Sequence, residues 1–276
     1  TVSPTGGATG EIDPASPIGT GLMGLWHFNN NVLDSSGNNR NGTIVGNVNC
    51  SVSGQFNQGC HFADDGGLVS LGQTTLTEAQ GALSVSTWFK DEQPGAPTGN
   101  AFLFLKSSNV WGLHRDTNLK LFFGVYNQAN VGAWAASDAV FNDTTRWHHL
   151  AGVYDGSKVQ LYFDGVLQQS QPAQSGLTPS SGNSLSIGLG WLGTMDETAI
   201  WNRALSTSEV AQLAGSQTAT GTFTSIRVTP ATLFYSLTPT WTETGSGTQL
   251  EVSFNNGTTW CTASKGVALS NPNCPF

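Results

Sequence analysis

The feature that most constrains this fold is a succession of short apolar and aromatic runs, each of strand length and most followed by a turn signal. Apolar residues that alternate or cluster over about 4–8 residues predict β-strands. Turn pairs such as Asp155-Gly156 and Asp164-Gly165 separate the runs, and the first of these predicts a hairpin of residues 150–154 and 159–163. We therefore expect an all-β chain. The clearest runs are residues 25–28, 83–89, 101–105, 119–125, 147–154 and 158–163.

Composition supports this prediction and excludes several classes of function. Charged residues make up only 10% of the 276 residues, whereas the chain has 34 Gly, 9 Trp and 14 Phe, which is typical of many strands joined by turns. The net charge of −8 repels phosphate backbones, so we expect no nucleic-acid partner. No apolar run approaches the roughly 20 residues of a membrane span, so we expect no membrane insertion. One helix is predicted, with Ser206 as its N-cap and Gly215 as its stop.

Composition also predicts the domain organisation. Residues 1–21 lack aromatic side chains and are rich in Gly, Pro, Ser and Thr, which indicates a linker or an extended N-terminal arm. Such an arm could mediate oligomer formation, although it shows no heptad pattern. Residues 22–215 form the main body. Residues 216–221 are of low complexity, and we predict a small, disulfide-stapled β module over residues 216–276.

Four cysteines fall into two pairs that are local in sequence. Their spacing fits no zinc motif, and four cysteines allow three connectivities. Because the two pairs lie far apart in sequence, we predict the local bridges Cys50–Cys60 and Cys261–Cys274, which imply an oxidising compartment outside the cell. The alternative is four free thiols in a cytosolic protein.

Residues 25–213 resemble the laminin-G-like, concanavalin-A-like lectin family. The resemblance is carried by an ordered set of motifs, namely LWHFNNNVLDSSGNNRNGT, GQFNQGCHFADDGGLVSLG, ALSVSTWFK, RWHHLAGVYDGSKVQLYFDGVL, SLSIG and WLGTMDETAIWNRALSTSEVAQL. It implies a two-sheet antiparallel jelly-roll sandwich, followed here by the small C-terminal β extension. It also implies loops at one rim that can bind calcium and glycans.

The same resemblance implies a calcium site. The family places an acidic residue after the aromatic of the first strand and another in a late motif, and these positions correspond to Asn29 and Asp196, with Asn31 and Asp34 as loop partners. Calcium prefers six to eight oxygen ligands, which such side chains supply. Asn29 departs from the family pattern, because it removes one formal charge. The alternative is that Asn31 and Asp34 make turn hydrogen bonds and that Asp196 binds backbone amides.

A glycan site requires an exposed aromatic platform beside polar side chains. Asn109, Trp111, Tyr126 and Trp134 are our candidates, since Trp134 in particular fits no alternating strand pattern. The alternative for the two tryptophans is packing in the core or between the sheets.

Catalysis is not expected. Glucanases of the resembled fold carry an E-x-D-x-x-E strand motif, and its only echo here, Glu11-Ile12-Asp13, is followed by Pro14, which disfavours a central strand. Asp196 and Glu197 are adjacent, so in a regular strand they would point to opposite faces.

The sequence therefore predicts a non-catalytic extracellular binding domain. We expect a carbohydrate-binding lectin or bacterial cell-surface adhesin, assisted by calcium, whose partner is a carbohydrate or a surface glycoconjugate. Two alternatives stay open: an accessory polysaccharide-binding module of a secreted glycoside hydrolase, and a structural tip domain of an oligomeric surface fibre.

Overall fold

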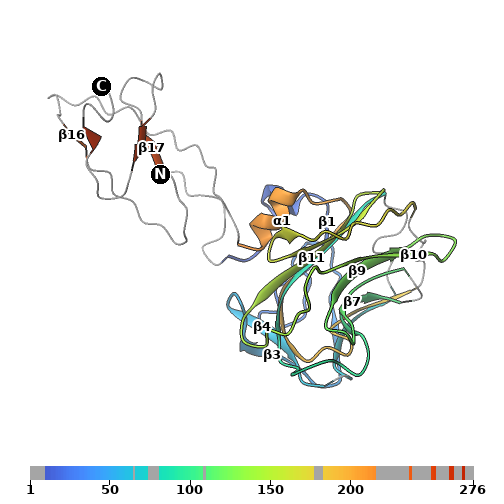
Figure 1. The fold of residues 1–276 in the computed structure, drawn as a ribbon. Helices are drawn as coiled ribbons and strands as arrows, with labels where there is room; N and C mark the ends of the chain where they lie inside the picture. Colours follow the sequence, from blue (N-terminus) through green and yellow to red (C-terminus); the bar gives the residue numbers. More distant parts are fainter. Residues whose placement is uncertain are drawn as a thin grey trace. The chain divides into compact units, whose positions relative to one another are not determined.

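The structure is a computed structural model that describes residues 10–64, 66–73, 81–107, 110–176 and 183–215, and the backbone of four short strands nearer the C-terminus. The chain divides into two compact units, Thr1–Ser216 and Gln217–Phe276. The first unit is a sandwich of two antiparallel sheets (Figure 1). The prediction of an all-β jelly-roll sandwich is confirmed.

One sheet has eight strands in the order β13-β12-β11-β6-β15-β4-β3, with β1 also paired to β15. The bounds of its strands are β1 (Leu22–Trp26), β3 (Val48–Ser53), β4 (Gln58–Phe62), β6 (Leu83–Asp91), β11 (His148–Tyr154), β12 (Val159–Phe163), β13 (Val166–Leu167) and β15 (Gly193–Trp201).

The facing sheet has seven strands in the order β10-β9-β8-β7-β14-β5-β2. The bounds of its strands are β2 (Thr43–Val45), β5 (Leu68–Gln73), β7 (Ala101–Lys106), β8 (Trp111–Arg115), β9 (Leu121–Tyr126), β10 (Gly132–Ala136) and β14 (Ser184–Ile187).

The predicted hairpin and the predicted helix are both present. Strands β11 and β12 pair in antiparallel register from Leu150 opposite Phe163 to Tyr154 opposite Val159. Helix α1 (Thr207–Leu213) begins after Ser206, whose hydroxyl accepts a hydrogen bond from the Glu209 amide while the Glu209 carboxylate accepts one from the Ser206 amide. This reciprocal capping box explains why the helix begins where the sequence predicts.

The main hydrophobic core lies between the two sheets. Most of the longer strands contribute alternate residues, because successive side chains of a strand point to opposite faces. The largest members are aromatic and almost fully buried: Trp26, Phe62, Phe89, Phe104, Trp111, Phe123 and Trp191.

A second core covers part of the outer face of the eight-stranded sheet. Side chains of residues 10–21 and of α1 pack there on Ala199 and Trp201 of β15. Ile12 and Ile18 are 8% and 5% exposed, and Ile18 lies within a short 3₁₀ helix (Pro17–Gly19). Residues 10–21 therefore pack on the sandwich and do not form a free linker, because two isoleucines in an otherwise polar segment anchor them. Residues 1–9 of the predicted linker or extended arm lie outside the described residues.

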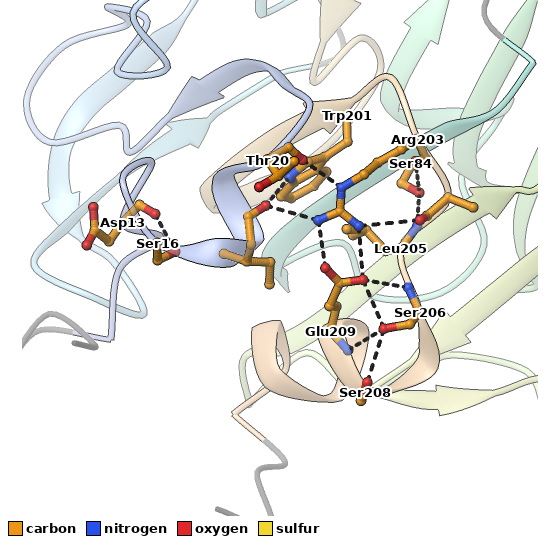
Figure 2. A network of polar contacts seen from close by, with 12 residues as sticks. Asp13, Ser16, Thr20, Ser84, Trp201, Arg203, Leu205, Ser206, Ser208 and Glu209 are labelled. Atoms are coloured by element: carbon orange, nitrogen blue, oxygen red, sulfur yellow. Dashed lines mark hydrogen bonds and ion pairs between the residues drawn. The ribbon is translucent and has the colours of Figure 1, made fainter. Parts of the chain in front are cut away.

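Arg203 ties this segment to the helix (Figure 2). Its guanidinium donates to the Thr20 carbonyl at 2.6 Å and to the Glu209 carboxylate at 2.6 Å, while the Trp201 indole donates to the Ile18 carbonyl at 2.8 Å. These bonds satisfy backbone acceptors that packing would otherwise leave without partners.

In the second unit the described strands form two short antiparallel pairs. They are β16 (Ser236–Leu237) with β19 (Leu269–Ser270), and β17 (Leu250–Val252) with β18 (Cys261–Ala263). The predicted Cys261–Cys274 bridge lies outside the described side chains and stays a prediction. Among the described residues, no helix has the length and apolar character needed to cross a membrane.

Candidate functional site

The side chains of the predicted calcium ligands are engaged in hydrogen bonds within the fold. Asp34 accepts hydrogen bonds from the amides of Leu25, Ser36 and Arg40 at 2.9–3.0 Å. Burial raises the pKa of Asp34, but these hydrogen bonds outweigh it and lower the pKa below its usual value. Asn31 closes a similar turn by accepting from the Leu33 amide. The turn alternative therefore accounts for both residues.

Asn29 is held by a different set of contacts. Its side-chain amide donates to the Glu11 carboxylate at 2.7 Å, and its side-chain oxygen accepts from the Gln58 amide at 3.1 Å. The Asn57 side chain also donates to Glu11, at 2.6 Å. Asn29 therefore helps to hold the N-terminal segment, with its donor group turned toward the carboxylate.

Asp196 of β15 lies on the outer face of the eight-stranded sheet, where it is covered by other residues. It is fully buried, and its two carboxylate oxygens accept from the Phe56 and Glu197 amides at 2.9 and 2.8 Å. Burial, together with the neighbouring charges of Glu197 and Glu11, raises the pKa of Asp196 to about 8 against the opposing effect of the amide bonds.

A cluster that the sequence does not predict lies beside Asp196. The ligand atoms of Glu11, His27 and Glu197 all lie within 4.8 Å of one another. His27 Nδ1 is 2.5 Å from Glu197 Oε1, and the Ile12 amide donates to Glu197 Oε2 at 2.7 Å. Burial lowers the pKa of His27, but the hydrogen bond and charge of Glu197 and the charge of Glu11 overcome this effect and raise it.

A bulge in β15 explains why the alternation of side chains along a strand does not predict this cluster. The register of β15 against β6 shifts between Asp196 and Ala199, and Glu197 has φ of +47°. An extra residue in one strand resets which face the following side chains occupy. Glu197 therefore lies on the same outer face of the sheet as Asp196, where it contacts the N-terminal segment. The expectation that the two carboxyls point to opposite faces is wrong.

The predicted glycan ligands separate into two groups. Trp111 is 1% exposed and belongs to the core between the sheets, so it is unavailable to a ligand. Asn109 lies outside the described residues. Trp134 and Tyr126 lie on the opposite, outer face of the seven-stranded sheet, because Phe123 and Val125 of the same hairpin fill the core.

On this outer face, Trp134 and Tyr126 belong to an aromatic patch. The His114 ring lies 5.1 Å from the rings of Phe102 and Trp134 and stacks on Phe122 at 5.4 Å, and Trp134 meets Tyr126 edge to face at 5.8 Å. All but His114 are partly exposed. The patch consists of Phe102, His114, Phe122, Tyr126 and Trp134. Outward-facing aromatic residues in β7, β8 and β9 were the signal that could have revealed its other three members.

Glycines underlie the patch. Gly112 and Gly124 face each other in β8 and β9, and Trp134 pairs with Gly124 from β10. A Cβ at Gly124 would run into the indole ring of Trp134. The ring therefore lies against the backbone of β9, where only glycine leaves room for it.

The patch carries no formal charge near neutral pH. Burial lowers the pKa of His114 to about 4 against the raising effect of Asp116, and the imidazole is therefore neutral. His114 Nδ1 is buried and finds no hydrogen-bond partner among the described residues. The patch thus combines an apolar platform with one unsatisfied polar atom.

The predicted Cys50–Cys60 bridge is present and joins β3 to β4. Both cysteines are buried in the core between the sheets.

Comparison with known proteins assigns the family. Residues 63–211 match the sequence model of the concanavalin A-like lectin/glucanases superfamily, and the chain belongs to this family. No curated protein matches the chain.

Several solved structures share the fold. Domain 4 of AbnA, a GH43 extracellular arabinanase from Geobacillus stearothermophilus solved with arabinotriose, is 23% identical, with a TM-score of 0.58 over 70% of this chain and 98% of that domain. The binding domain of Paraclostridial Mosquitocidal Protein 1 is 15% identical (TM-score 0.59, 72% of this chain, 53% of that one). The binding domain of botulinum neurotoxin DC in complex with rat synaptotagmin II is 16% identical (TM-score 0.59, 72% and 52%). The present chain thus spans about half of each toxin domain.

Proposed function

We propose that this chain is a non-catalytic extracellular carbohydrate-binding domain whose ligand lies on the aromatic patch. The observation that carries the proposal is the partly exposed Trp134 indole lying against Gly124, flanked by Tyr126 and Phe122. Aromatic side chains that keep one face free offer a large, rigid contact area to an apolar ring face. The C–H face of a sugar ring is such a surface.

Polar groups beside the platform can fix the orientation of a bound sugar. Tyr126 of the patch is partly exposed and carries a phenolic hydroxyl, and Ser186 and Ser70 pair side by side on the same face of the seven-stranded sheet. Few polar groups placed around an apolar platform are typical of small-molecule sites. An uncharged patch favours a neutral saccharide.

Catalysis does not fit this proposal. Glu197 of the close Glu11–Glu197 pair is 2% exposed beneath the N-terminal segment, and the adjacent Asp196 is 0% exposed. A polysaccharide cannot reach them. The same reasoning predicts that the protein releases no reducing sugar from the oligosaccharides it binds.

The disulfide supports an extracellular location. Disulfides persist in oxidising compartments, and the Cys50–Cys60 bridge is buried in the core. A secreted or cell-surface adhesin satisfies this condition. The similarity to a domain of a secreted arabinanase favours the alternative of an accessory polysaccharide-binding module, for which arabinan oligosaccharides are the first ligands to test.

Isothermal titration of the full chain with a panel of neutral oligosaccharides that includes arabinotriose tests the proposal. Trp134→Ala should weaken binding by about 2 kcal/mol, the scale of a tryptophan hot spot, which is about 30-fold. Val166→Ala is the control, because Val166 is an exposed apolar residue of β13 in the other sheet and should leave this affinity unchanged. Wild-type protein that binds no member of the panel, or that binds equally after Trp134→Ala, would refute the proposal.

A bound divalent cation is a second part of the proposal, with a ligand set different from the predicted one. Asp196 accepts two amides, a geometry suited to the ionised carboxylate, yet burial and the Glu197 charge raise its pKa. A calcium ion held by Glu11 and Glu197 would place positive charge near Asp196 and relieve this conflict, and carboxylate oxygens are its preferred ligands. Binding would also release protons, since the ion competes with them for these groups.

Calcium titration followed by thermal melting tests this second part. The melting temperature of the wild type should rise with calcium, because a ligand that binds only the folded state stabilises it. Glu197→Gln should abolish the rise, whereas Asp64→Asn, in an exposed turn, should retain it. A melting temperature that is the same with calcium and with a chelator would refute the proposed cation site.

A further inference from the structure

The outer face of the eight-stranded sheet is only half covered. Residues 10–21 and α1 pack on one half, and the other half carries an open groove of about 410 Å³. This volume lies within the range of small-ligand sites. The groove is lined by Val52, Ser53, Gly54, His61, Lys90, Glu92, Trp147 and Thr194.

The strand register places four of these side chains in one row. Lys90 of β6 pairs with Thr194 of β15, and Thr194 pairs with His61 of β4. Trp147 precedes the pair of His148 with Phe89, so the same register brings it beside Lys90. Since neighbouring strands lie about 4.8 Å apart, the row from Trp147 to His61 spans about 14 Å. This length accommodates roughly two or three sugar rings laid across the strands.

Among the described residues, the ammonium group of Lys90 in this groove has no polar partner. His61 Nε2 lies 2.9 Å from Glu92 Oε2, and the Thr194 hydroxyl donates to Glu92 Oε1 at 3.4 Å. No described residue hydrogen-bonds to or forms an ion pair with the Lys90 ammonium.

Trp147 completes the arrangement. It is partly exposed, lines the groove, and its ring contacts no other aromatic ring among the residues that the structure describes. The groove therefore presents an aromatic face, an adjacent cation, and the acceptor oxygens of Glu92 beside Thr194 and His61.

We propose that this groove binds a short acidic saccharide. The sugar carboxylate pairs with the Lys90 ammonium, the ring that carries it stacks on Trp147, and hydroxyls of the next ring donate to Glu92. A charged pair of this kind contributes more than a neutral hydrogen bond, and it selects the acid over its uncharged ester. The site lies on the opposite sheet from the aromatic patch, so it does not depend on the function proposed above.

Titration of the full chain with trigalacturonate and with its methyl ester tests the proposal. The wild type should bind the acid about tenfold more tightly than the ester, because the ester lacks the charge that Lys90 recognises. This preference should decrease as salt concentration rises, since partly exposed charges are screened. Lys90→Gln should bring both ligands to the affinity of the ester, and Trp147→Ala should weaken both.

Two control variants separate this site from other effects. Lys158→Gln removes an exposed lysine at the β11–β12 turn and should leave the preference for the acid intact. Trp134→Ala should leave trigalacturonate binding unchanged even if it abolishes binding at the aromatic patch. Thermal melts of each variant show whether it folds. The salt dependence is measured on the wild type, so this test does not depend on the folding of any variant. No binding of trigalacturonate, equal binding of acid and ester, or a preference that survives Lys90→Gln would overturn the proposal.

Discussion

Two glycines beneath the aromatic patch provide a matched pair of substitutions. Gly124 and Gly112 face each other in β9 and β8, and both point to the outer face of the same sheet. A methyl group at Gly124 would lie 2.8 Å from Cε2 of the Trp134 indole and closer still to two other ring atoms. At Gly112 the nearest atoms are Phe102 Cε1 at 3.5 Å and the Phe104 carbonyl at 3.6 Å, which are ordinary contacts.

The expected effects therefore have opposite signs. Gly124→Ala displaces the Trp134 ring, and overpacking of this kind costs about 1–3 kcal/mol. Replacing glycine within a strand returns about 0.5–1 kcal/mol, which leaves a net loss of about 1 kcal/mol and lowers the melting temperature by roughly 3 °C. Gly112→Ala gains the strand preference without the clash and should raise the melting temperature by a similar or smaller amount.

Ligand binding separates the two variants further. Gly124→Ala should lower the affinity for a patch-bound oligosaccharide by up to about 30-fold, as Trp134→Ala does, because the indole no longer lies against the sheet. Gly112→Ala should bind like the wild type. Thermal melting, near-UV circular dichroism of the indole and isothermal titration give the three readouts. Equal behaviour of the two alanine variants would refute the placement of Trp134 over Gly124.

Three further predictions concern stability. Ser206→Ala should destabilise the protein by about 1 kcal/mol, since it removes the cap of α1, and denaturant unfolding will measure this loss. With calcium chelated, the melting temperature should fall as the pH rises toward and through about 8. The reason is that the folded-state pKa of Asp196 lies above its unfolded value of 3.8, so the stability contributed by its protonated form is lost. Asp196→Asn should flatten this profile, and an unchanged profile would contradict the raised pKa of Asp196. Replacing Cys50 and Cys60 together by alanine should cost about 3 kcal/mol in the same unfolding assay, given the short loop that the bridge closes.

The strand pattern predicted much of the fold because alternation and turn residues are local properties. Residues 83–89 and 158–163 correspond closely to β6 and β12, and the capping residues of α1 lie where the sequence indicates. Strands such as β3 and β8 escaped prediction, since polar residues or glycine interrupt their apolar residues. Their place in the sheet depends on partners distant in sequence.

The site was harder to predict because it depends on tertiary contacts. The burial of Trp111 and the exposure of Trp134 follow from which face of each strand meets the core. The cluster around Glu197 depends on a β-bulge and on Glu11 from a segment whose composition indicates a linker. Neither a bulge nor the docking of a polar segment leaves a periodic signal in the sequence.

Chemical-shift mapping of the full chain during titration with arabinotriose and other neutral oligosaccharides tests the central claim most directly. We predict that the largest shifts occur at the Trp134 indole NH and at the amides of Phe122 and Tyr126 on the outer face of the seven-stranded sheet. Shifts confined to other parts of the molecule, or no shifts with any of these oligosaccharides, would contradict carbohydrate binding at the aromatic patch.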